Sequence, residues 1–385
     1  MSYKVWLVLA QAVGYGMSKF VGVKVISELK NHGRRNAILI LVCIAGMSWL
    51  FFALVPAPFN IVFLVTNGLP LGMIWGIIFA YLEGRKVTEV LAAALSVSFI
   101  FSSGLCRSIG AYLIQEGVAE RWMPFVACCL FILPLIVFAY LLDKVPPPST
   151  GDIAMRTQRR PMNGRDRRRF LMAFLPGIFL FVIAYMLLTA FRDFRDNFSV
   201  EVWESLGYGN SPKIFTTTEV PISLLVLVIV GALMFIRNNH TALVVNHIII
   251  GSGMLLIGIS SYLFQIHRIS PSTWMIAIGL GLYLGYVPFN SIFFDRLLAA
   301  FRYTGTVGFI MYVADSFGYL ASLGILFYKE LALPDMKWLD VFLKSGYIIS
   351  IFGTTLVIGS AVYFHLRYLQ LSGTSVQRKQ RLSTP

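Results

Sequence analysis

The sequence predicts an all-α integral membrane protein, a helical bundle of two halves with eleven transmembrane helices arranged as five and six. Two observations indicate this class. Of the 385 residues, 57% are hydrophobic and only 13% are charged, with a mean hydropathy of +0.74, whereas soluble domains carry about 25% charged residues. The hydrophobic residues also gather in runs of the length that one bilayer crossing needs, roughly 20 residues.

Each apolar run predicts one transmembrane helix. In hydrocarbon the backbone must satisfy its own hydrogen bonds, and the roughly ten-residue alternation of barrel strands does not occur, so helices are expected throughout. The first run continues past Gly14 and Ser18 and is too long for a cleaved signal peptide. The runs cover residues 3–27, 36–55, 59–82, 88–115, 122–142, 170–191, 220–236, 241–264, 273–294, 303–328 and 341–364.

The orientation follows from the basic residues in the connections. Twenty of the 32 Lys and Arg residues fall on one side of the predicted bilayer, eight on the other and four inside spans. The positive-inside rule therefore places the C-terminus in the cytoplasm, with the protein in the plasma (inner) membrane. The net charge of +14 does not indicate nucleic-acid binding, because the basic residues form no continuous soluble face.

The domain boundaries follow from the longest connections. We expect an N-terminal half over 1–142, a basic cytoplasmic linker over 143–169, a C-terminal half over 170–366 and a cytoplasmic tail over 367–385. Basic residues near Arg169 favour an electrostatic contact between the linker and anionic lipid headgroups. On the outer side, the charged and aromatic stretch from Arg192 to Glu219 is expected to be the other sizeable loop.

A short motif recurs in the two halves. Gly68-Leu-Pro-Leu-Gly72 in the third run resembles Gly281-Leu-Tyr-Leu-Gly285 in the ninth, and Arg107-Ser-Ile-Gly110 resembles Asp315-Ser-Phe-Gly318 in the runs that follow. Both pairs run in the same direction through the predicted bilayer, so the halves are expected to be parallel repeats. The first half then has one helix fewer before its motif than the second.

These residues resemble the major facilitator superfamily. Its organophosphate and sugar-phosphate antiporter branch has a run similar to Gly14-Tyr-Gly-Met-Ser18-Lys19-Phe20, which here leads to Glu28 and a basic turn at Gly33-Arg34-Arg35. The resemblance implies a twelve-helix transporter fold whose first helix has no counterpart here, and it places Arg192 near a substrate-binding arginine. An uncharacterised bacterial family of facilitator-like proteins is also similar, and it implies no substrate.

Three ionisable residues lie deep within the runs, where a charge costs about 2.5–3.5 kcal/mol on insertion scales and is usually functional. These are Lys19, Arg107 and Asp315. In the resembled fold the helices of Lys19 and Asp315 touch, so we hypothesise that these two pair or exchange partners during transport. Lys19 and Arg107 would supply positive charge to a cavity, and the planar fork of Arg suits phosphate or carboxylate.

Alternative interpretations stay open for three of these residues. Lys19 could extend its stem toward the interface, and Arg107 could tether carbonyl groups at the end of a span. Arg192 could belong to a solvated stretch at the interface instead of contacting substrate.

The function predicted from the sequence is secondary active transport of a small organic anion, such as a phosphorylated metabolite, by alternating access in a monomer. No P-loop, His-Glu-x-x-His, Gly-x-Ser-x-Gly or Cys-x-x-Cys motif occurs, and the four cysteines lie in apolar runs, so we expect no enzyme activity, cofactor, metal or disulfide. Two alternatives remain: a membrane sensor that binds ligand without transport, and an N-terminally truncated, inactive chain.

Overall fold

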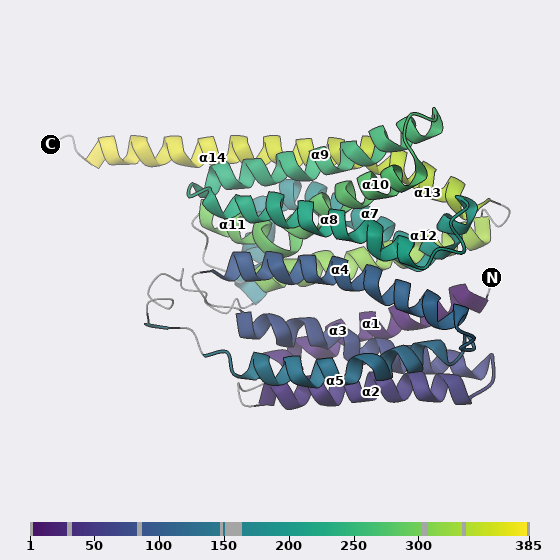
Figure 1. Cartoon of the computed structure of the whole chain (residues 1–385). Coiled ribbons are helices and arrows are strands. Elements are labelled where there is room, and N and C mark those ends of the chain that lie inside the picture. Colours follow the sequence, from purple (N-terminus) through teal and green to yellow (C-terminus); the bar gives the residue numbers. More distant parts are fainter. Residues whose placement is uncertain are drawn as a thin grey trace.

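The computed structural model describes an all-helical protein, with no strand among the residues that it covers. These residues are 3–28, 33–82, 87–146, 149–150, 164–301, 303, 307–332 and 336–382, and the side chains of 19–28, 79–80, 88–89, 92, 164, 166–167, 290–291, 307–310, 312, 329–330, 332 and 372–382 are outside the description. The helices run roughly side by side along one axis, and short connections join them at the two ends of the bundle (Figure 1).

The N-terminal part of the bundle contains five long helices. They are α1 (Tyr3–Glu28), α2 (Arg34–Leu54), α3 (Val62–Leu82), preceded by the 3-10 turn η2 (Phe59–Ile61), α4 (Thr88–Gln115) and α5 (Met123–Asp143).

The C-terminal part begins with α7 and contains two helices that are interrupted by π turns. Its elements are α7 (Gly164–Ser205), α8 (Lys213–Ala232), the 3-10 turn η3 (Leu233–Phe235), α9 (Asn239–Gln265), α10 (Pro271–Pro288), η4 (Phe289–Phe293), α11 (Phe294–Ala300), α12 (Val307–Ala332), α13 (Trp338–Ile348), η5 (Ile349–Gly353) and α14 (Thr354–Leu382).

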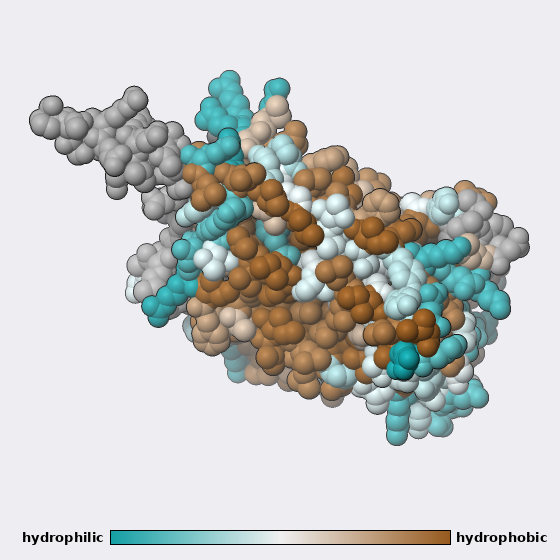
Figure 2. Space-filling view, turned by 90° about the horizontal axis from the view of Figure 1, so that it is seen from above, coloured by the Kyte–Doolittle hydropathy of each residue, from teal (hydrophilic) through white to brown (hydrophobic). Residues whose placement is uncertain are grey.

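The helical prediction is confirmed, because the described part of each apolar run is almost entirely helical. Eight helical stretches of the described chain are long and apolar enough to cross a membrane, judged by length and composition. The surface agrees: hydrophobic side chains form a broad band between two hydrophilic ends (Figure 2). Eleven crossings, with a division at residues 143–169, stay a prediction. Several helices extend beyond the predicted boundaries: α7 begins at Gly164, α8 begins at Lys213 and α14 continues to Leu382.

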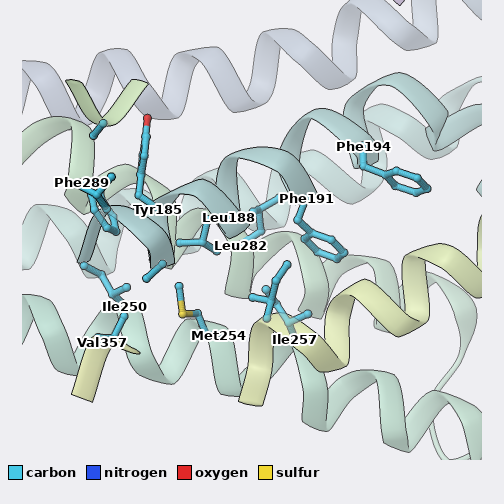
Figure 3. Close-up of a cluster of buried hydrophobic side chains, with 14 of the residues drawn as sticks. Tyr185, Leu188, Phe191, Phe194, Ile250, Met254, Ile257, Leu282, Phe289 and Val357 are labelled. Atoms are coloured by element: carbon cyan, nitrogen blue, oxygen red, sulfur yellow. The ribbon is translucent and has the colours of Figure 1, made fainter. Parts of the chain in front are cut away.

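The largest core lies in the C-terminal half, around α7. One face of α7 carries buried apolar residues three or four positions apart, the spacing that places side chains on one side of a helix. Leu188 and Phe191 from this face form one layer with Leu282 of α10 and with Met254 and Ile257 of α9 (Figure 3). The core therefore fixes the rotation of α7 about its axis, which directs the opposite, polar face of α7 toward the N-terminal half.

The N-terminal half has smaller apolar clusters and relies on close contact between α1 and α3. A Cβ atom at Gly14 would overlap the carbonyl oxygen of Val65, and one at Gly68 would overlap that of Gln11. Gly281 of the second motif lies instead against α9, where a Cβ would overlap the Gly253 carbonyl oxygen. If the halves are repeats, their glycine motifs therefore bring different helix pairs together.

Candidate functional site

A cavity of about 330 Å³ with charged and amide side chains on its wall lies between the two halves of the bundle. This volume is at the lower end of the range of small-molecule sites. Two helices of the C-terminal half, α7 and α10, supply about half of its wall. The lining residues are Val8, Gln11, Ala12 and Tyr15 of α1, Trp75 of α3, Ser96 and Phe99 of α4, Arg192, Asp193, Asp196 and Asn197 of α7, Tyr283, Tyr286 and Val287 of α10, and Asp315 and Tyr319 of α12.

Most of the charged side chains on the cavity wall lie on one face of α7. The predicted outer loop from Arg192 is wrong, because α7 continues to Ser205 with a kink at Phe198. Arg192, Asp193, Asp196 and Asn197 all line the cavity, since residues three and four positions apart share a helix face. The loop prediction ended the span at the first charged residue, although Arg192 pairs with its neighbour Asp193 and Asp196 pairs with the distant Arg107.

Arg192 is buried and held against Asp193. Its Nε and Nη2 atoms donate to Asp193 Oδ1 at 3.0 and 2.6 Å, and its Cζ atom lies 4.4 Å from the centre of the Tyr286 ring. Asp193 also accepts a hydrogen bond from Ser322 of α12 at 2.6 Å. Arg192 is 8% exposed, so the solvated-interface alternative does not apply to it.

Arg107 connects the two halves beside the cavity. It forms an ion pair with Asp196 of α7, a second with Glu219 of α8 at 3.6 Å, and a hydrogen bond to Ser103 at 2.7 Å. Glu219 in turn pairs with Arg195 at 2.8 Å, and both of these side chains are 2% exposed. The partners described for Arg107 are thus carboxylates and a hydroxyl, where the tether interpretation expected carbonyl groups at a span end.

Asp315 of α12 also lines the cavity, and it accepts a hydrogen bond from Tyr185 of α7 at 2.5 Å. The side chain of Lys19 lies outside the described residues, so its pairing with Asp315 stays a prediction. Of the four candidate residues from the sequence, Arg192 and Asp315 contribute to the cavity wall, and Arg107 contacts that wall through Asp196.

The polar contacts described between the two halves gather toward the end of the bundle where α1 begins. Lys4 of α1 pairs with Glu201 of α7, and the hydroxyls of Ser108 and Thr216 lie 2.7 Å apart, between α4 and α8. Gln115, at the end of α4, donates to the Asn210 carbonyl oxygen at 3.4 Å. Farther toward the other end of α4, its contact with α8 and α10 is apolar and includes Val97 and Val226.

Sequence reasoning missed five functional candidates: Gln11, Asp193, Asp196, Asn197 and Glu219. Those on α7 were detectable, because their spacing matches one polar helix face. Glu219 was a carboxylate next to an apolar run. Gln11 gave no signal, since a single neutral amide is unremarkable in a span.

Comparison with known proteins identifies a family and a fold. The model of the "Family of unknown function (DUF5690)" matches residues 1–367, and no curated protein matches the chain. The "Crystal structure of D-xylose-proton symporter" is similar with a TM-score of 0.60 and 15% identity, covering 94% of this chain and 88% of the other. The human organic anion transporter MFSD10 (TETRAN) gives a TM-score of 0.52 and 12% identity, over 95% and 82%. These likenesses show the fold of the major facilitator transporters and confirm the predicted multi-pass, facilitator-like bundle.

Proposed function

Because the chain belongs to the DUF5690 family, whose description assigns no activity, we propose its function from the site: secondary active transport of a small polar solute by alternating access. The observation that carries the proposal is the cavity of about 330 Å³ between the halves, with charged side chains on its wall. Burying a charge within a membrane bundle costs free energy, so buried charges usually mark a functional site. A cavity at the seam between two halves is where transporters of this fold bind their substrates.

In the proposed mechanism, the contacts near the start of α1 form and separate as the two halves move. The pairs Lys4–Glu201, Arg107–Asp196 and Ser108–Thr216 each join one half to the other at this end. The positive-inside rule assigns this end to the outer side of the membrane. In the proposed cycle these contacts close the outer side in the present state, and they separate when the halves rock to open the cavity outward.

The negative charge that the sequence analysis expects of the substrate meets an obstacle in the site. An organic anion, as in the organophosphate branch, requires an arginine able to accept it. Here Arg192 and Arg107 each already have a carboxylate partner, so an anion would have to displace Asp193 or Asp196. Protonation of the displaced carboxylate would make such transport proton-coupled.

The proposal is tested with purified full-length protein in proteoliposomes. The vesicles are incubated with a mixture of small metabolites under an imposed proton gradient, and the lumen is analysed by mass spectrometry. Transport predicts enrichment of at least one solute that collapses when the gradient is removed. A sensor would bind a solute in nanodiscs without flux, and that result would overturn the proposal.

Closure of the outer side is tested by a disulfide. In a background without the four native cysteines, the double variant Ser108→Cys/Thr216→Cys places two thiols where the hydroxyls are 2.7 Å apart. Oxidation should lock the two halves together and stop transport, and reduction should restore it. The two single-cysteine variants are the controls. Unchanged transport after complete cross-linking would contradict the rocking mechanism.

A further inference from the structure

The cavity wall contains two amide side chains, one from each half, whose orientations are fixed by the protein. They are Gln11 of α1 and Asn197 of α7. An amide has a donating nitrogen and an accepting oxygen that look alike in shape, so its hydrogen-bond partners decide which atom faces a ligand. Both amides can be assigned from partners that admit only one solution.

Asn197 is assigned directly. Its Nδ2 atom donates to the carbonyl oxygen of Asp193, one helical turn earlier, at 2.8 Å. A carbonyl oxygen cannot donate, so the reversed amide would place two acceptors in contact. This bond uses one N–H of Asn197, and the accepting atom Oδ1 is left for a ligand.

Gln11 is assigned through Asn67, which is 0% exposed. Asn67 Nδ2 donates to the carbonyl oxygen of Ala45 at 3.0 Å, which fixes the orientation of this second amide. Its Oδ1 atom then requires a donor and receives Gln11 Nε2 at 2.9 Å. The chain from Ala45 to Asn67 to Gln11 thus uses one N–H of Gln11 and leaves its accepting atom Oε1 for the cavity. A buried acceptor without a donor is costly, so Asn67 holds this orientation firmly.

We infer that Gln11 and Asn197 form a two-sided acceptor clamp for a neutral, hydroxyl-rich solute. Each oxygen accepts a hydrogen bond from a ligand hydroxyl, one from each half, and the aromatic rings of Tyr15, Trp75 and Tyr286 cover the apolar faces of the ligand. An ionised phosphate or carboxylate group accepts hydrogen bonds and does not donate them, so it cannot bind to these two oxygens. In this assignment Asn67 is a positioning residue that does not touch the solute.

The inference rests on the proposed transport function and names its substrate class. The probes are D-xylose, its singly deoxygenated analogues and D-xylonate, which keeps the same skeleton and adds a carboxylate. Uptake into proteoliposomes and binding in nanodiscs are measured for the parent protein and for the variants Gln11→Leu and Asn197→Leu. The control is Gln265→Leu, which removes an exposed amide at the end of α9.

We expect the parent protein to take up D-xylose in preference to D-xylonate and to discriminate against an analogue that lacks one hydroxyl. Each variant should raise the KM for D-xylose by about three- to tenfold, as for one lost hydrogen bond, and should lose its preference over the corresponding analogue. A structural role alone would lower uptake of all probes equally and would overturn the clamp.

The possible failures are distinguishable. Preferred uptake of D-xylonate overturns the substrate class and leaves transport intact. Amide-dependent binding of D-xylose without flux of any solute overturns transport and supports the clamp. Neither binding nor uptake of D-xylose and its analogues overturns the clamp, whatever other solutes are transported.

Discussion

The two halves of the bundle differ in the polar and charged side chains that they bury. The C-terminal half buries Arg192, Arg195, Glu219 and Arg296, whereas the buried polar side chains described in the N-terminal half are serines and asparagines. The same contrast holds for apolar residues: 56% of the most apolar stretch of α9 is buried, against 6% of that of α5.

This difference assigns different tasks to the halves. The C-terminal half is held by an extended core around α7 and carries its charges in fixed pairs, so it can act as the rigid body that presents the site. The N-terminal half turns apolar side chains outward and contributes neutral groups to the cavity, with Arg107 as its charged contact beside that cavity. The charged side chains of the site therefore lie mainly in the C-terminal half, and the proposed cycle places the motion at the seam between the halves.

The largest expected effect is a loss of unfolding free energy, and it should differ between two ion pairs. One pair is buried in the C-terminal half, and the other is partly exposed between the halves. Glu219→Ala leaves Arg195 buried without its partner, and breaking such a pair costs about 3–5 kcal/mol. Glu201→Ala removes the pair with Lys4, whose side chains are 42% and 26% exposed, and pairs of this kind contribute about 0–1 kcal/mol. Thermal unfolding in detergent measures both.

The double variant Arg195→Met/Glu219→Met serves as the control for Glu219→Ala. Removal of both charges leaves no unpaired group, so most of the lost stability should return. Equal losses for Glu219→Ala and Glu201→Ala would contradict the distinction between the two kinds of pair.

A somewhat smaller effect compares apolar residues of the two halves. Leu282→Ala in α10 opens a cavity in the C-terminal core, where the residue is 0% exposed, and should cost about 2–5 kcal/mol. Leu133→Ala in α5 affects a side chain that is 69% exposed on the apolar band, where lipid can fill the space, and should change the unfolding midpoint little. Similar losses would show that α5 is covered by protein, which would contradict the assignment of its face to lipid.

The fold could be predicted from the sequence because a bilayer imposes strong local constraints. Apolar runs such as 241–264 must be helical when no water is available for the backbone, and α9 (Asn239–Gln265) matches this run closely. At Arg192 the same reasoning failed, because the averaged hydropathy of a stretch reports composition and not the direction of each side chain. A helix with one apolar face and one charged face therefore appeared to end too early.

The site could be predicted only in part. Arg107 and Asp315 were found because a charge inside a span is rare, and Arg192 was found through a family resemblance. Their partners were not found, since Asp196 lies 89 positions from Arg107 and nothing local indicates that contact. The role of Gln11 depends on Asn67, a contact between two helices that sequence periodicity does not determine.

The smallest expected effect tests how the N-terminal half holds together without a large core. At Gly14 a new Cβ atom would overlap the Val65 carbonyl oxygen of α3, and backbone cannot move aside as a flexible side chain can. Gly14→Ala should therefore force α1 and α3 apart and cost about 1–3 kcal/mol, despite the better helix propensity of Ala. At Gly16, two residues later in the same helix, a new Cβ atom would meet no other atom within 4 Å, so Gly16→Ala should be neutral or stabilise by up to about 1 kcal/mol. Unfolding midpoints of the two variants would be compared in one detergent. Because the two changes add the same methyl group to the same helix, equal midpoints would mean that close packing against α3 does not stabilise this half.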